Sequence, residues 1–510
     1  MELIELKSPS VTEVLCKENW VGEIPADVRI QIGADGAVSV TAKETGLTKI
    51  RFCYPASQKM RESYVYGDTW ERAYGDLEWS RKKRIMPWYC LFTDLSETCG
   101  YGVKVLPNAF CYWEYEDDWL YLTFDIRNGT ECLYLQGKEL VMAVLVSEKY
   151  VGDVHAAAHS FCKRMCDFPR TLKYPVYGGN DWYCNYGDSS YEKIMVHAKR
   201  IAECAPDTDN RPYMVIDDGW QLCANRGACR DSCTEGPWKA NGKFKDMAKL
   251  AKDISDIGVI PGIWMRPLLT GADLPEECVL KTINQCQILD PSHEESIRII
   301  KGEVSKIVSW GFKLIKHDFT TNELFGQWGF TMGAEPILGK LEFFDKTRTT
   351  VQIVKDMYLA IREAAGEDTV IIGCNTISHL SAGIFELQRT GDDTSGLEWE
   401  RTKKMGINTL AFRMMQHQAF YAVDADCVGI TTKIPWEKNR QWLDVLAKSG
   451  TPLFVSIAED AYSDEVKADI KAAFQKASES HNASVPEDFI DTYSPKRWSS
   501  DFGTDVYDWE

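Results

Sequence analysis

The first 165 residues alternate or cluster apolar side chains in short runs, separated by Gly, Asp and Asn. A period of two with little helical periodicity is typical of antiparallel strands packed as two sheets. We therefore predict an N-terminal antiparallel β-sandwich domain over residues 1–165. The clearest expected strands are residues 28–32, 38–41, 50–53, 119–124 and 140–146.

From about residue 174 the pattern changes to β-rich runs that alternate with amphipathic stretches of helical length. Repeated βα units predict a parallel sheet, and eight of them fit a (β/α)8 TIM barrel. The predicted catalytic barrel covers residues 174–480, and the tail 481–510 is expected to pack on it. The expected strands are residues 175–178, 213–216, 259–264, 312–316, 369–373, 384–387, 426–430 and 452–455. The expected helices include residues 191–204, 246–256, 296–309, 348–365, 398–415 and 437–448.

Composition narrows the class of ligand. The 58 Lys and Arg residues against 76 Asp and Glu give a net charge of −18, which would repel nucleic acid and anionic membranes. No apolar run approaches the ~20 residues of a membrane span. The chain has 17 Trp, more than usual, and although most of these rings are expected in the core, some suit the apolar faces of sugars. We expect a soluble protein with a neutral or cationic substrate and neither nucleic-acid nor membrane partners.

The N-terminus is acidic and lacks a cationic segment followed by an apolar core, so a cytoplasmic location is expected. The 17 cysteines are an odd number and are expected to stay reduced. Cys223, Cys229 and Cys233 lie close together, but without Cys-x-x-Cys spacing or a neighbouring His they favour ordinary thiols over a structural zinc site. Neither a metal nor a cofactor is expected.

Charged residues follow the predicted strands at the end where a TIM barrel builds its site. Asp217 and Asp218 come directly after the second strand, where two buried carboxylates are costly unless something polar binds them. At the end of the fourth strand, side-chain alternation points Lys316 and Asp318 into the barrel mouth and His317 away from it. A buried salt bridge that only fills space is the alternative interpretation.

Further carboxylates recur at residues 389–393 and 424–427, around the same predicted rim. Paired carboxylates without a His and Cys ligand cluster indicate glycoside hydrolysis, in which one acid attacks or activates water and another protonates the leaving oxygen. A magnesium-dependent lyase or isomerase is the alternative, because carboxylates also bind magnesium. Lys316 argues against it, since its charge would repel a metal ion.

Several ordered segments resemble the α-galactosidases of glycoside hydrolase family 36 and its clan. NDW at 180–182 and DADC at 424–427 are similar to two of the family's segments. The remaining matches are VIDDGW (215–220), GIW (262–264), LDPS (289–292), LIKHD (314–318), GC (373–374) and RTGDD (389–393). Together they cover roughly residues 175–460.

The resemblance implies that Asp318 is the nucleophile of a retaining double displacement and that Asp392 is the acid/base, with Asp393 as the alternative. It implies that Asp217 and Asp218 hold the hydroxyls at carbons 4 and 6, which favours galactose. The implied substrate-binding residues are Asp217, Asp218, Trp220, Trp182, Trp264, Lys316, Cys374, Asn375 and Arg389.

Two departures from the family leave the sugar open. Arg266 and Pro267 stand where many members have Glu-Pro, and residues 375–379 replace a Gly-rich segment near the 2-substituent. An N-acetylgalactosaminide, an arabinopyranoside or an α-glucoside therefore stays an alternative glycone. A raffinose-synthase-like transglycosylase and, in another class, an inactive sugar-binding protein also stay open. A homo-oligomer also stays open. Trp70 and Trp79 of the N-terminal domain are considered for a position at a barrel mouth, either of their own chain or of a neighbouring subunit.

Overall fold

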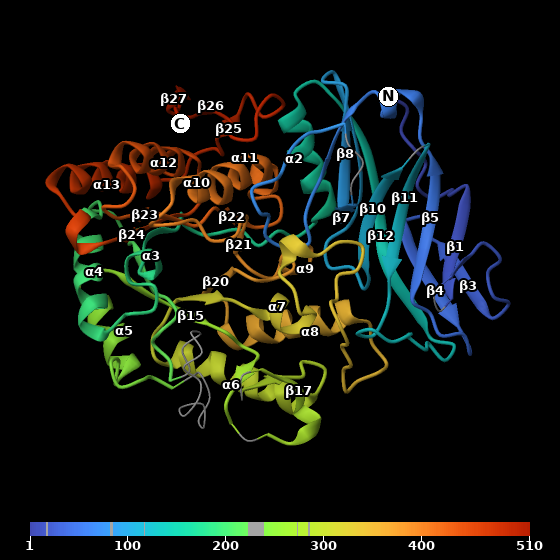
Figure 1. The fold of residues 1–510 in the computed structure, drawn as a ribbon, viewed down its shortest axis with the longest axis horizontal. Helices are drawn as coiled ribbons and strands as arrows, with labels where there is room; N and C mark the ends of the chain where they lie inside the picture. The colour runs from blue at the N-terminus through green and yellow to red at the C-terminus, as the bar shows by residue number, and fades with distance from the viewer. Residues whose placement is uncertain (17–18, 82–84, 117, 223–238, 273, 284–285) are drawn as a thin grey trace.

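Two six-stranded antiparallel sheets pack face to face in the N-terminal part of the chain (Figure 1). The computed structural model describes residues 1–510 except 17–18, 82–84, 117, 223–238, 273 and 284–285. The first sheet has the order β2 (Asn19–Val21), β1 (Val11–Cys16), β5 (Lys49–Pro55), β11 (Trp119–Asp125), β10 (Phe110–Glu116) and β7 (Ile85–Pro87). The second has the order β3 (Val28–Ile32), β4 (Ala37–Ala42), β12 (Glu139–Val151), β9 (Glu97–Val103), β8 (Tyr89–Thr93) and β6 (Tyr64–Gly67).

The predicted alternation explains these sheets. Along β4 every second side chain is buried, as expected for a strand with one face on a core. Helix α2 (Val154–Met165), which the sequence analysis did not separate from the strands, packs against β9. Gly100 and Gly102 of β9 leave room for this contact, because a Cβ at either position would meet Phe161 or Met165 of α2. A short helix, α1 (Gln58–Arg61), precedes β6.

The second unit is a barrel of parallel strands. In chain order these are β13 (Tyr177–Asn180), β14 (Tyr213–Ile216), β15 (Ile260–Met265), β19 (Leu314–His317), β20 (Val370–Gly373), β21 (Leu387–Arg389), β22 (Ala422–Asp424), β23 (Cys427–Ile430) and β24 (Leu453–Ile457). Their side chains are almost all buried, as in a sheet covered on both faces.

The barrel closes through a strand that is broken in two. Asp424 of β22 pairs with Arg389, whereas Cys427 of β23 pairs with Phe454. Only Ala425 and Asp426 separate the two segments, and Asp426 has a left-handed backbone with φ 72°. The nine segments therefore correspond to the eight strands of a TIM barrel, and the fold class predicted from the sequence is confirmed.

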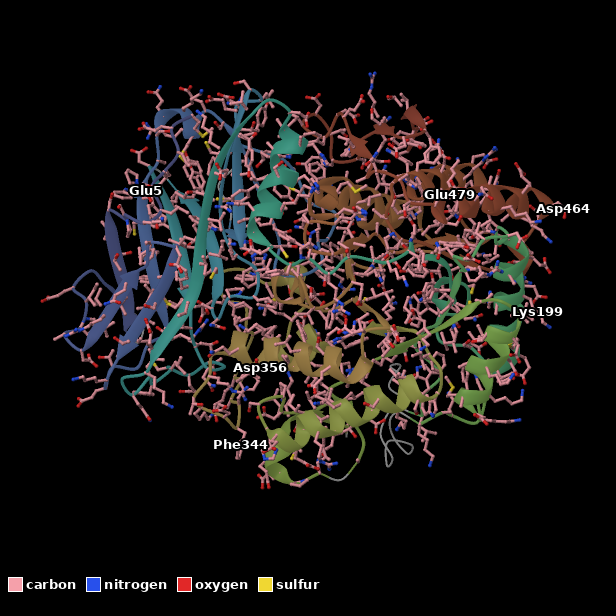
Figure 2. All side chains as sticks on the ribbon, turned by 180° about the vertical axis from the view of Figure 1, so that it is seen from behind. Glu5, Lys199, Phe344, Asp356, Asp464 and Glu479 are labelled. Carbon is pink, nitrogen blue, oxygen red and sulfur yellow. The ribbon has the colours of Figure 1, made fainter. Side chains whose placement is uncertain are left out.

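Helices cover the outside of the barrel. They are α4 (Tyr191–Cys204), α5 (Met247–Asp256), α6 (Glu294–Ser309), α8 (Thr350–Ala365), α10 (Trp399–Thr402) with α11 (Thr409–Arg413), α12 (Trp436–Lys448) and α13 (Asp464–Ala477). Lys199 on α4 and Asp464 at the start of α13 lie at the end of the molecule opposite Glu5 of the sandwich (Figure 2). Within the described ranges, no helix has both the length and the apolar character needed to cross a membrane.

Shorter elements fill the connections. They are α3 (Trp182–Asn185), α7 (Thr320–Phe325) and α9 (Ser378–Ser381) at the mouth, the sheet of β16 (Leu269–Thr270), β18 (Cys286–Leu289) and β17 (Val279–Ile283), and the C-terminal sheet of β25 (Val485–Pro486), β26 (Arg497–Ser500) and β27 (Gly503–Val506). The tail contacts the barrel helices: Trp399 donates to the Trp509 carbonyl at 2.7 Å, and Tyr507 donates to Asp444 at 2.9 Å.

Two sequence expectations need local correction. The sixth strand begins at Leu387, where the prediction ended it, because Ile384 and Phe385 donate to Ser381 and continue the turn after α9. The helix expected over 398–415 is interrupted by a π-helical turn, Lys403–Asn408. Gly406 lies in that turn against Trp442, where a Cβ would approach the indole to 2.8 Å.

The sandwich is attached to the barrel by a buried ion pair. Asp68, just after β6, accepts from the Arg413 guanidinium at 2.8 and 3.0 Å and from Gln416 at 2.8 Å. Asp68 and Arg413 are 3% and 0% exposed, so neither charge is solvated by water. Tyr66 of β6 adds a hydrogen bond to the Phe412 carbonyl at 2.8 Å.

We expect Asp68→Ala to lower the free energy of unfolding by about 3–5 kcal/mol, because it leaves the Arg413 charge buried and unpaired. Asp118→Ala, which breaks a solvent-exposed pair with Arg61 in the same domain, should cost at most about 1 kcal/mol. Urea unfolding of both variants measures the difference. Equal costs would contradict a structural role for the buried pair.

Candidate active site

The carboxyl ends of the barrel strands bring polar side chains from distant segments together. Asn180 ends β13, Asp217 follows β14, and Lys316 lies near the end of β19. Parallel pairing aligns these ends, since Asn180 pairs with Val215 and Lys316 with Trp264. This end of a (β/α)8 barrel is where its loops form a site.

Asp217 has several hydrogen-bond donors around its carboxyl group. Its Oδ2 accepts from Lys316 Nζ at 2.7 Å and from Asn180 Nδ2 at 2.7 Å, and its Oδ1 accepts from the Asp218 amide at 2.8 Å. Burial would lower the pKa of Lys316, but Asp217 and other nearby groups raise it well above its ordinary value. Lys316 is therefore a fixed cation at the floor of the mouth.

Asp218 has a different environment from its neighbour. Gln221 donates to its Oδ1 at 2.5 Å, and no cation forms an ion pair with it among the residues that the structure describes. Burial, followed by the charge of Asp217, raises its pKa to about 6. The carboxyl can thus act as a hydrogen-bond donor in mildly acidic solution and as an acceptor at higher pH.

This shift predicts a pH dependence of stability. Because the pKa of Asp218 is about 6 when folded, against an ordinary value of about 3.9, the folded state binds more protons than the unfolded state between these values. The contribution of Asp218 is therefore fully present below about pH 4 and is lost as the pH rises through about 6. Between those pH values we expect the stability difference between wild type and Asp218→Asn to change by roughly 3 kcal/mol. Urea unfolding at several pH values measures it, and a constant difference would contradict the raised pKa.

Asp318 directly follows β19, two residues after Lys316, and is 8% exposed. Its Oδ2 accepts from the Trp264 indole at 2.9 Å, and its Oδ1 accepts from the Phe319 amide at 2.8 Å. Phe319 has a left-handed backbone, φ 67°, which turns the chain sharply after the strand. His317 faces outward onto Tyr358 and Phe385, as the predicted alternation requires.

The two adjacent aspartates after β21 have distinct partners. Asp392 is 15% exposed, and its oxygens pair with Arg72 at 3.0 Å and Arg401 at 2.7 Å. Asp393 is 38% exposed, and its Oδ1 pairs with Arg389 at 3.0 Å, with Arg72 farther away at 3.7 Å. Among the described residues, no hydrogen bond or ion pair reaches Oδ2 of Asp393. One oxygen of Asp393 is thus available to a ligand, whereas both oxygens of Asp392 are engaged.

Arg389 is a fully buried cation between two carboxylates. It pairs with Asp426 at 2.6 Å as well as with Asp393, and its Nη1 lies 3.6 Å from the Cys374 sulfur. The Tyr183 hydroxyl also donates to Asp426. Burial raises the pKa of Cys374 well above its ordinary value, so this residue is a neutral thiol.

Known structures share this architecture, although no protein-family model matches the chain. An α-galactosidase from Thermus thermophilus in complex with p-nitrophenyl α-D-galactopyranoside aligns with a TM-score of 0.62 and 17% identity, over 94% of this chain and 96% of that chain. A variant of a family 36 α-galactosidase from Geobacillus stearothermophilus, bound to 1-deoxygalactonojirimycin, aligns with a TM-score of 0.58 and 13% identity, over 88% and 67%. The galactosidase domain of an α-galactosidase-sucrose kinase gives 0.57 and 14%, over 93% and 70%. The chain has the fold of the family 36 α-galactosidases.

This α-galactosidase fold agrees with the resemblance found in the ordered sequence motifs. The structure also separates the three tryptophans that the sequence analysis grouped as an apolar wall. Trp182 keeps part of its surface exposed, whereas Trp220 and Trp264 are 0% and 1% exposed. The Trp220 indole donates to the Trp264 carbonyl at 2.9 Å, so Trp220 supports the strand end from behind.

The sequence analysis missed two residues of the sandwich, Glu71 and Arg72, that lie in the site. Glu71 and Arg72 reach the mouth of their own barrel, where Glu71 accepts from Asn375 at 2.6 Å. The sequence gives little indication of this position, because an adjacent Glu and Arg in a loop usually form a solvated pair. Trp70 and Trp79, considered for this position, are instead 0% and 4% exposed in the core.

A metal site finds no support in the part of the chain that is described, where no group of three or more His, Cys, Asp or Glu side chains is arranged to bind an ion. Cys223, Cys229 and Cys233, the cysteines weighed for zinc, lie outside the described residues.

Proposed function

We propose that this protein is a retaining α-galactosidase that hydrolyses α-galactosides of oligosaccharides. The observation that supports it best is the arrangement at the barrel mouth: the carboxylates Asp318 and Asp393 accompany a fixed Lys316–Asp217 pair. Glycoside hydrolysis requires two such carboxylates and groups that bind the sugar hydroxyls. The aligned α-galactosidase from Thermus thermophilus forms complexes with p-nitrophenyl α-D-galactopyranoside and with stachyose, which supports the same activity.

In the proposed first step, a carboxylate oxygen of Asp318 attacks the anomeric carbon as the bond to the leaving oxygen breaks. The acid/base gives its proton to that oxygen, and a glycosyl ester remains on Asp318. In the second step the acid/base takes a proton from water, the water oxygen attacks the anomeric carbon, and the ester bond breaks. Trp264 and the Phe319 amide hold Asp318 in place for both steps.

We propose Asp393 as the acid/base, in preference to Asp392, which the motif alone favoured. An acid/base must reach the glycosidic oxygen and exchange a proton with it. Asp393 has the greater exposure and an oxygen that has no partner among the described residues, whereas two arginines engage both oxygens of Asp392. The proposed hydroxyl-binding residues are Asp217, Asp218, Lys316, Asn375, Cys374, Arg389 and Trp182.

The cellular compartment and the oligomeric state remain proposals. The cysteines whose side chains are described are free thiols, which fits a reducing compartment such as the cytoplasm. A homo-oligomer stays a prediction.

A panel of nitrophenyl glycosides tests the proposed function. We expect turnover of the α-galactoside, and the α-N-acetylgalactosaminide, β-arabinopyranoside and α-glucoside run beside it identify any other glycone. Product analysis with added sucrose distinguishes water from a sugar as the acceptor. Binding of galactose without turnover of any glycoside would instead support an inactive sugar-binding protein.

A further inference from the structure

A dipeptide of the β-sandwich forms part of the barrel mouth. Glu71 and Arg72 follow β6 and are 0% and 4% exposed. The next residue, Ala73, donates to the Thr390 carbonyl at 2.9 Å and accepts from the Asp392 amide at 3.0 Å. These backbone bonds fix the sandwich segment directly against the loop that carries both candidate acids.

Arg72 reaches the two aspartates from the sandwich side. Its Nη1 lies 3.0 Å from Asp392 and 3.7 Å from Asp393, and its Nε donates to Glu71 at 2.9 Å. The guanidinium also lies over the Trp328 ring, 5.4 Å from its centroid. A planar guanidinium held on several sides has little freedom, so it defines the position of the carboxylates it contacts.

Glu71 connects the same segment to the opposite side of the site. It accepts from Asn375 Nδ2 at 2.6 Å and from the Gly329 amide at 3.1 Å. Asn375 in turn accepts from the Phe319 amide at 3.1 Å, in the turn directly after Asp318. The buried Glu71–Arg72 pair therefore lies beside Asp393 on one side and, through Asn375, contacts the turn that follows Asp318 on the other.

We propose that Arg72 is a positioning residue that holds the acid/base Asp393 in its working place, with Glu71 as the buried partner that fixes Arg72. This inference rests on the proposed function. The catalytic groups come from the barrel, so the sandwich takes part in the reaction through this contact.

Charged and titratable groups from several elements surround Asp393. They are Arg72 of the sandwich segment, Arg389 at the end of β21, Lys316 of β19, Arg401 of α10, the neighbouring Asp392, and the hydroxyls of Tyr183 and Tyr186 at α3. Burial raises the pKa of Asp393, but the four cations together hold it below its ordinary value. Removing one cation therefore raises that pKa, and the protonated form persists to higher pH.

Two substrates distinguish a misplaced acid/base from general damage to the active site. Phenyl α-galactoside has a poor leaving group that needs a proton from the acid, whereas fluoride leaves α-galactosyl fluoride without one. The test variant is Glu71→Gln/Arg72→Met, which removes both buried charges and keeps an amide oxygen for Asn375. We expect kcat/KM for the phenyl galactoside to fall about tenfold or more, with little change for the fluoride. The basic limb of the phenyl galactoside pH profile should move to higher pH.

Two further variants complete the design. Arg72→Lys keeps the charge but cannot contact Glu71 and both aspartates as a fork, so it should lose rate on the phenyl galactoside without shifting the pH profile. If the double variant does not fold, Arg72→Lys alone tests whether Arg72 positions the acid/base. Arg127→Met removes a different sandwich arginine that pairs with Glu335 of the barrel at 2.7 Å, and it should leave both substrates unaffected.

The outcomes are distinct. Equal losses on both substrates with an unchanged pH profile, or no loss at all, would overturn the role of Arg72. A wild-type protein that hydrolyses neither galactoside would overturn the proposed function, and this inference with it.

Discussion

Replacing Asp318 with alanine is expected to lower kcat for nitrophenyl α-galactoside by about 10⁴-fold or more, because the variant lacks the carboxylate that is proposed to form the glycosyl ester. Steady-state kinetics with the released nitrophenol as the readout measures the loss. Asp253→Ala, which removes a partly exposed carboxylate from α5, should keep wild-type activity.

Added azide makes this test specific. In Asp318→Ala, azide can enter the space of the lost carboxylate and attack the anomeric carbon, so that β-galactosyl azide forms as nitrophenol leaves. Recovery of the rate with this inverted product would identify Asp318 as the nucleophile. Retained activity without azide would overturn the assignment.

Asp393→Ala is expected to lower kcat/KM for phenyl α-galactoside by about 10²–10⁴-fold, since the leaving oxygen is no longer protonated. Galactosyl fluoride should lose much less. Azide, which needs no general base, should attack the anomeric carbon of the ester in place of water, break the bond to Asp318 and give α-galactosyl azide, the opposite anomer to that from Asp318→Ala. Kinetics with both substrates and NMR of the azide product measure these effects.

Asp392→Ala is the matched control, because it removes the adjacent carboxylate that two arginines engage. It should lower the rate less than Asp393→Ala does and, because it changes the position of Arg72, more on phenyl galactoside than on the fluoride, and it should yield no galactosyl azide. The azide product with Asp392→Ala and not with Asp393→Ala would return the acid/base role to Asp392, as the sequence motif favoured.

The pattern of short sequence segments was sufficient to predict two side chains at the barrel mouth. Asp217 and Lys316 could be placed in the barrel mouth because strand-end position and side-chain alternation are properties of short segments. The structure brings these two side chains to 2.7 Å from each other, although they are 99 positions apart in the chain. The broken seventh strand was found only in part, because the segment Ala422–Asp424 is as short as a turn.

Contacts between domains could not be predicted. The choice between Asp392 and Asp393 depends on which arginines reach them, and Arg72 comes from the sandwich. Glu71 contacts Asn375 across 304 positions, and no periodicity or motif relates residues so far apart. The burial of Trp220 likewise follows from its packing on Trp310, which lies 90 positions further along the chain.

The stereochemistry of hydrolysis tests the central claim most directly. Proton NMR of wild-type protein mixed with nitrophenyl α-galactoside shows which anomer of galactose appears first, before mutarotation equilibrates the two. The double displacement at Asp318 predicts α-galactose as the first product. Initial β-galactose would mean direct attack by water and would contradict the glycosyl ester, and the absence of any galactose would contradict the proposed activity.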